Sequence, residues 1–252
     1  MNRPKPWQCL TVALILIVLS GCRGPAPTAT PVPATPTPRP TRVPPTATPR
    51  PTSTAPVATP TLEAGWVLYE KPADGFAIAL PPTWRQIDMD PQTWQASLDA
   101  IKAQNPDLAP LLEGQTRSLL EAGIKFFGFD LAPEALATGV ATNVNVLIQS
   151  LPAEVSLDFY VQLNVGQLEN MPSVVKPVEH RRVQFADGEA EELRYAMNMV
   201  APSGAALTLW TDQYLFVREK QVYVVTCTTS KDAASQYAET FAKIGQSFRL
   251  LP

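Results

Sequence analysis

The first 62 residues contain no aspartate or glutamate. All 23 acidic residues therefore lie in residues 63–252, against 14 of the 20 lysines and arginines, which gives this part a net charge of about −9. A surface of that sign repels phosphate groups, so nucleic acid is excluded as a partner. The 190 residues that remain suit one domain of ordinary size.

Residues and motifs that carry chemistry are also scarce. His180 is the only histidine, so a metal site with two histidines is impossible, and no nucleophile lies near it in sequence for a general base to activate. The chain has no Gly-rich phosphate loop, no Gly-x-Ser-x-Gly elbow and no Cys-x-x-Cys pair. The sequence therefore predicts no catalytic residue, no cofactor and no metal ligand, and so a protein that is not an enzyme.

Four acidic residues gather near one predicted hairpin: Asp187, Glu189, Glu191 and Glu192. Their oxygens could in principle hold Ca²⁺, but calcium needs ligands that converge on one point. Side chains along a strand alternate between its two faces, so the pattern favours a solvated turn.

The N-terminus has the three parts of an export signal. Arg3 and Lys5 precede an apolar run over 10–19, about half the length of a membrane-spanning helix. The run ends in Leu19-Ser20-Gly21-Cys22, which resembles the lipobox of bacterial lipoproteins. The resemblance implies that residues 1–21 are a cleaved lipoprotein signal peptide and that lipidation, including palmitate, occurs on Cys22. The alternative is an ordinary signal peptide in which Cys22 is incidental.

Cysteine counting agrees with this interpretation. Cys9 would leave with the signal and lipid would occupy the thiol of Cys22, so Cys227 alone remains and no intramolecular disulfide is possible. Cys227 lies in a β-branched and aromatic run over 222–228 that is typical of a buried strand. A small core residue is a better interpretation there than a nucleophile.

Residues 25–61 are almost entirely Pro, Thr and Ala. Such a segment has too few apolar side chains to offset its ordering entropy, so we expect residues 22–62 to be a lipidated, disordered linker with a reach of about 100 Å at most. It would hold a domain away from the extracytoplasmic face of the cell membrane. A ligand for a Pro-binding domain and an O-glycosylated stem are the other interpretations.

Residues 63–252 show the periodicities of one α+β domain. Strands are predicted over 66–70 and 75–80, joined by a turn at Asp74-Gly75, and helices follow Asp90-Pro91 (with Trp94, Leu98 and Ile101 on one face) and span 107–122, with Gly123 as a stop. Further strands are predicted over 124–131, 140–148, 174–186, 189–200, 206–218 and 221–228, with helices over 156–171 and 231–245.

Consecutive strands with short turns must be antiparallel. Helices before, between and after the strands therefore predict one antiparallel sheet covered by helices on both faces. Trp66, Trp84 and Trp94 could line a cleft beside the first hairpin, although core packing explains them as well.

The segment from Tyr69 to Trp84, YEKPADGFAIALPPTW, resembles the opening of PsbP-like domains, and Ile244-Gly245-Gln246-Ser247-Phe248-Arg249 is similar to their C-terminal pattern. The resemblance implies an α/β/α sandwich. It further implies non-enzymatic roles, such as assembly factors and partner-binding modules, and no binding residue of the family maps onto this sequence.

Together these features predict a membrane-tethered extracytoplasmic lipoprotein that acts as a partner-binding or assembly module of the cell envelope, with an unidentified envelope protein as partner. The alternative is a carrier or sensor of a small apolar ligand or lipid. A carrier would need a cavity between the sheet and the 91–122 helices.

Overall fold

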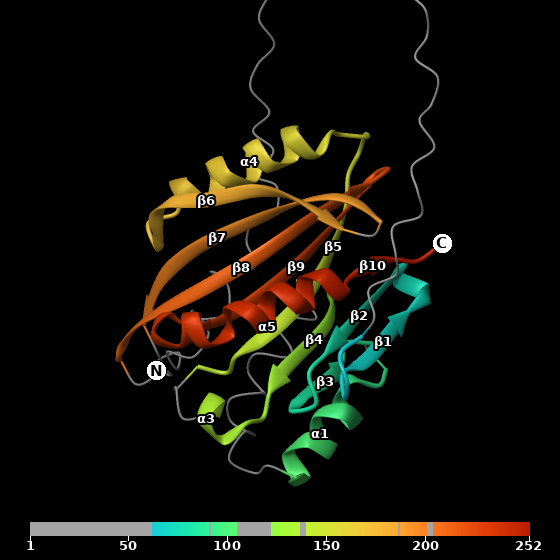
Figure 1. Ribbon diagram of the computed structural model, residues 1–252, viewed down its shortest axis with the longest axis vertical. Coiled ribbons are helices and arrows are strands. Elements are labelled where there is room, and N and C mark those ends of the chain that lie inside the picture. The colour runs from blue at the N-terminus through green and yellow to red at the C-terminus, as the bar shows by residue number, and fades with distance from the viewer. Residues whose placement is uncertain (1–61, 91, 105–121, 137–139, 186, 201–203) are drawn as a thin grey trace, which may run out of the picture. The chain divides into compact units, whose positions relative to one another are not determined.

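The computed structural model describes residues 62–252, except 91, 105–121, 137–139, 186 and 201–203 (Figure 1). The larger of two antiparallel sheets consists of β3 (Trp84–Asp88), β4 (Ile124–Asp130), β5 (Asn143–Ser150), β6 (Val174–Phe185), β7 (Gly188–Val200), β8 (Ala206–Arg218) and β9 (Gln221–Ser230). Its spatial order is β3-β4-β5-β9-β8-β7-β6, so β3 and β6 are its edges. Within the described residues, no helix combines the length and apolarity needed to cross a membrane.

The smaller sheet joins the two ends of the domain. It contains β1 (Val67–Lys71), β2 (Phe76–Leu80) and β10 (Arg249–Leu250), in the order β1-β2-β10. The predicted hairpin is therefore confirmed, and Gly75 takes the left-handed conformation (φ 72°) that its tight turn requires.

This second sheet corrects the expectation of a single one. Pro81 and Pro82 have little capacity to extend the hairpin, because proline has no backbone N–H to donate. The chain turns there, with the Trp84 amide donating to the Pro81 carbonyl at 3.0 Å, and enters β3 of the large sheet. β3 has no counterpart among the strands that the sequence predicts.

Four helices are described: α1 (Trp94–Gln104), α3 (Pro133–Leu136), α4 (Leu157–Asn170) and α5 (Ala234–Ser247). Ser156 caps α4 by accepting from the Phe159 amide at 3.2 Å, and Asp90 accepts from the Gln92 amide at 2.8 Å ahead of α1. The predicted helix over 107–122 lies outside the described residues, as do the side chains of Leu98 and Ile101.

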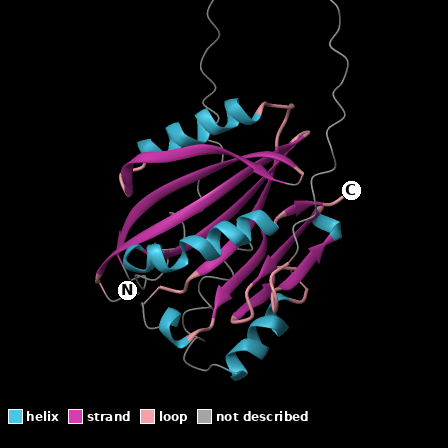
Figure 2. Cartoon of the chain, viewed as in Figure 1, coloured by secondary structure: helices cyan, strands magenta, loops and turns pink. Residues whose placement is uncertain are grey.

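Two hydrophobic cores lie on opposite faces of the large sheet. The helices α5 and α4 cover these two faces (Figures 1 and 2). The α5 face packs Tyr237, Phe241 and Ile244 against the small sheet and against alternate residues of β8 and β9. The other face packs Tyr160, Val161 and Leu168 of α4 against β6, β7 and β8. The expected arrangement of helices on both faces of an antiparallel sheet is thus confirmed for the large sheet.

Cys227, Trp66 and Trp84 pack in the interior, as the sequence predicts. Cys227 is fully buried in β9, and burial, with a smaller contribution from Asp212, raises the pKa of its thiol well above the ordinary value. Trp84 belongs to the core of the α5 face and Trp66 packs against it. These tryptophans are therefore packing residues.

Candidate functional site

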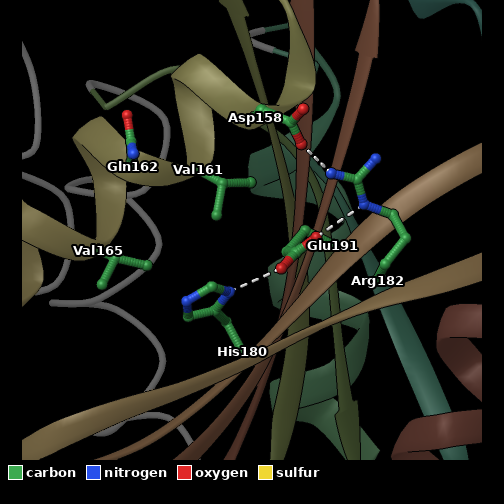
Figure 3. Close-up of a pocket in the computed structure, with 7 residues that line it drawn as sticks. All are labelled: Asp158, Val161, Gln162, Val165, His180, Arg182 and Glu191. Carbon is green, nitrogen blue, oxygen red and sulfur yellow. Dashed lines mark hydrogen bonds and ion pairs between the residues drawn. The ribbon is translucent and has the colours of Figure 1, made fainter.

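A pocket of about 260 Å³ lies between α4 and the β6–β7 edge of the large sheet (Figure 3). The helix lines it with Asp158, Val161, Gln162 and Val165, and the strands line it with His180, Arg182 and Glu191. The helix wall is therefore half apolar, through the two valines, and half polar, whereas the sheet wall is polar and charged throughout.

The charged wall follows from the register of the β6–β7 hairpin. Arg182 pairs in register with Glu191. His180 comes two residues before Arg182 in β6, so its side chain lies on the same face of the sheet. His180 Nδ1 is 2.7 Å from Glu191 Oε1, and the side chain of Glu191 is only 6% exposed.

This contact selects one tautomer of His180. An ionised carboxylate only accepts hydrogen bonds, so Nδ1 must carry the proton that is shared with Glu191. In the neutral imidazole, Nε2 then keeps a lone pair, and Figure 3 shows this nitrogen turned away from Glu191. The contact with Glu191 thus orients the ring, and in the neutral imidazole Nε2 is a hydrogen-bond acceptor.

Arg182 connects the helix to both strands. Its Nε donates to Glu191 at 2.9 Å and its Nη1 donates to Glu189 at 2.9 Å. Its Nη2 donates to Asp158 of α4. These bonds raise the pKa of Arg182 above its usual value, the one to Glu191 most strongly. With three carboxylates around one arginine, the site has an excess of negative charge while His180 is neutral.

A second ionic cluster lies on the opposite face of the sheet, where Glu192 and Asp212 are each 1% exposed. Arg194 donates to Glu192 at 2.7 Å and lies 3.7 Å from Asp212, and Arg181 pairs with Glu192. Burial raises the pKa of Asp212 to about 6, with a further rise from Glu192, and Arg194 opposes the shift. Tyr214 also reaches Glu192, at 3.3 Å.

The expectation of a solvated turn is wrong for Glu191 and Glu192, although it holds for Asp187 and Glu189, which are exposed. The two glutamates do point to opposite faces, but both faces are covered. The sequence signal that could have shown this is the Asp187-Gly188 turn, because a turn fixes the register of its hairpin. In that register Phe185 pairs with Gly188, Arg182 with Glu191 and Arg181 with Glu192. The described residues contain no group of three or more His, Cys, Asp or Glu side chains placed to hold a metal ion.

We expect Arg182→Ala to destabilise the domain by about 2–3 kcal/mol. Removing one partner of a fully buried ion pair costs about 3–5 kcal/mol, and the effect is smaller here because Arg182 is 39% exposed and His180 still contacts Glu191. Chemical denaturation measures the change. The matched control is Glu189→Ala, which removes a 60% exposed partner and should change stability by less than about 0.5 kcal/mol. Equal effects of the two substitutions would contradict the prediction that the buried Glu191 is the partner through which Arg182 stabilises the domain.

We expect Asp212→Asn to stabilise the domain at pH 7.5 and to lose this advantage near pH 4. A folded-state pKa of about 6, against an ordinary 3.8, means that the folded chain holds the proton more tightly than the unfolded chain. The associated stability is complete below the unfolded pKa and falls away as the pH rises through 4 to 6, by roughly 3 kcal/mol at most. The lost contact with Arg194 reduces the gain.

Unfolding free energies at the two pH values test this prediction. Asp158→Asn is the control, because that carboxylate is 81% exposed and its removal should alter stability by less than about 0.5 kcal/mol at either pH. Destabilisation by Asp212→Asn at pH 7.5 would contradict the prediction, because it would mean that the attraction of Arg194 outweighs the cost of burying the ionised Asp212.

The fold described above is an α/β/α sandwich with a small accessory sheet. No protein-family model matches the chain, and no curated protein matches it either. Among solved structures, the chain is similar to the cyanobacterial PsbP protein CyanoP of Synechocystis, with 13% identity, 74% of this chain and 93% of that chain covered, and a TM-score of 0.41.

A second similar structure is LpqN of Mycobacterium tuberculosis, described as involved in cell envelope biogenesis. It has 10% identity and a TM-score of 0.43, with 70% of this chain and 83% of that chain covered. PsbP is the family that the hairpin motif resembles. At these identities and TM-scores the similarities carry no argument about family membership or activity.

Proposed function

We propose that this protein is a lipid-anchored accessory module of the cell envelope, which acts by binding a partner protein and not by catalysis. Cys22 holds the lipid, and the Pro/Thr-rich linker sets the domain at a distance from the extracytoplasmic face of the membrane. The lipobox-like Leu19-Ser20-Gly21-Cys22, placed before a long linker and a separate packed domain, carries the proposal.

The pocket supports binding over catalysis. Its lining contains no serine, threonine, cysteine or lysine that His180 could activate as a nucleophile. The two carboxylates of the lining, Asp158 and Glu191, are both paired with Arg182. Both carboxylates of the lining are thus engaged by the same arginine, and neither is left beside His180 as a separate general acid or base.

The same pocket argues against an apolar cargo. Its sheet wall consists of ionised or polar side chains, and a lipid placed against Glu191 would leave that wall poorly solvated. The cavity that the carrier alternative requires, beside the 91–122 helices, falls largely on residues outside the described part of the chain.

Native mass spectrometry of the full chain, purified in detergent from membranes, separates the two functions. We expect the mass of residues 22–252 plus covalent acyl groups, without a further stoichiometric lipid. In-cell crosslinking before extraction should join the domain to an envelope protein. A noncovalent lipid that stays bound at one per chain would contradict the partner-binding function and favour the lipid carrier.

A further inference from the structure

We propose that the α4–β6–β7 pocket receives the side chain of a lysine from the partner protein. The inference deepens the proposed function, on which it rests, by naming the chemistry of the partner at this site: a lysine-bearing surface segment. It is argued from the size, charge and hydrogen-bonding capacity of the pocket.

Size points to a side chain. Ligand sites for drug-sized molecules have volumes of about 300–1,000 Å³. The pocket, at about 260 Å³, is smaller. Val161 and Val165 line its helix side, and such a wall suits the four-carbon stem of lysine, which is apolar up to its ammonium group.

Charge points to a cation. Asp158, Glu189 and Glu191 surround the single cation Arg182, so the cluster has a net charge of about −2 when His180 is neutral. The domain as a whole is acidic, with a net charge of about −9 over 63–252. Complementary charge of this kind accelerates encounter with a basic partner and rejects acidic ones.

Hydrogen bonding favours lysine over arginine. Arginine binds best to a carboxylate that offers both oxygens, but the oxygens of Glu191 already accept from His180 and Arg182. When its imidazole is neutral, His180 instead presents one lone pair on Nε2, which matches a compact ammonium donor. Glu191 fixes the imidazole in the tautomer that makes Nε2 an acceptor.

The helix that borders the pocket also carries exposed apolar side chains that do not line it. Phe159 and Leu163 lie one helical turn apart on α4 and are 58% and 49% exposed. Gln162, which lines the pocket, lies between them in sequence. A partner surface that extends along α4 beyond the pocket would meet these two large apolar side chains, and buried apolar anchors are where binding energy concentrates in interfaces.

The solitary histidine makes the test direct, because every imidazole signal in the NMR spectrum of the histidine-labelled full chain belongs to His180. The probe is N-acetyl-lysine methylamide, and its neutral counterpart is N-acetyl-norleucine methylamide. We expect the lysine probe to shift the imidazole signals saturably with a millimolar Kd. The norleucine probe should cause no saturable shift, and the corresponding arginine probe should bind about fivefold or more weakly.

Two variants on the same helix give a matched comparison. Gln162→Lys places an ammonium in the pocket and should weaken the lysine probe by about tenfold or more. Gln167→Lys makes the same chemical change at an exposed position that does not line the pocket, and should leave Kd within about twofold.

Equal shifts with the lysine and norleucine probes, or unchanged binding in Gln162→Lys, would overturn the lysine site. If the lysine probe fails while native mass spectrometry still finds an acylated chain free of noncovalent lipid, and the crosslinked partner persists, only the pocket assignment fails. A retained noncovalent lipid would instead overturn the proposed function itself.

Discussion

In the Cys22→Ser variant we expect no labelled palmitate, no cleavage of the signal and a chain that retains residues 1–21. A serine hydroxyl is a far weaker nucleophile than a thiolate, so it does not take the diacylglycerol, and the lipoprotein peptidase then does not recognise the precursor. The effect is all or none, because acylation precedes cleavage. Gel mobility and intact mass report both steps.

The wild-type chain supplies the contrast. It should incorporate palmitate, partition into detergent and stay with membranes in high salt, because screening weakens charge attraction but not the burial of acyl chains. Cys9→Ser is the control, since that residue lies within the proposed signal and should leave labelling and cleavage unchanged. A wild-type chain recovered soluble and unlabelled would remove the tether from the proposed function.

Phe248→Ala should destabilise the folded domain by about 3–5 kcal/mol, the largest effect that we expect from a single core substitution here. Phe248 is 2% exposed and follows α5 directly. Its ring contacts Phe76 of the small sheet (centroids 5.6 Å apart) and Phe216 and Tyr223 of the large sheet (4.6 and 6.0 Å). Truncation would therefore open a cavity where the two sheets and α5 meet.

Thermal and chemical denaturation measure this loss, which corresponds to a fall in Tm of roughly 10 °C for a domain of this size. Phe159→Ala is the matched control, because it removes the same atoms from a side chain that is 58% exposed. It should change stability by less than about 0.5 kcal/mol. If Phe248→Ala had an effect as small as that of Phe159→Ala, the ring contacts of Phe248 would not be what holds the two sheets together.

Much of the fold was predictable because its signals are local. The strands ending at the Asp187-Gly188 turn and the apolar stripe Tyr237, Phe241 and Ile244 are properties of short windows with period 2 or 3.6. The structure reproduces them within one or two residues. The separation of the first hairpin from the large sheet was missed, because it depends on β10 returning to pair with β2 from the far end of the chain.

The pocket was missed for a related reason. His180 and the glutamates are visible in the sequence, but their local patterns predict only an exposed strand residue and a solvated turn. The hairpin register brings His180, Arg182 and Glu191 onto one face, and that much could have been derived from the turn. Asp158 could not, since it reaches Arg182 only because α4 packs over this edge of the sheet.

The sequence by itself determined most of the long strands and helices, the burial of Cys227 and the acidic character of the domain, because these depend on residue type and spacing along the chain. Only the tertiary structure decided that Glu191 and Glu192 are buried, that burial raises the pKa of Asp212, and that a polar pocket opens beside α4. The physical reason is that desolvation and ion pairing depend on which elements cover a face. Coverage is set by contacts between segments far apart in the chain, which no local pattern encodes.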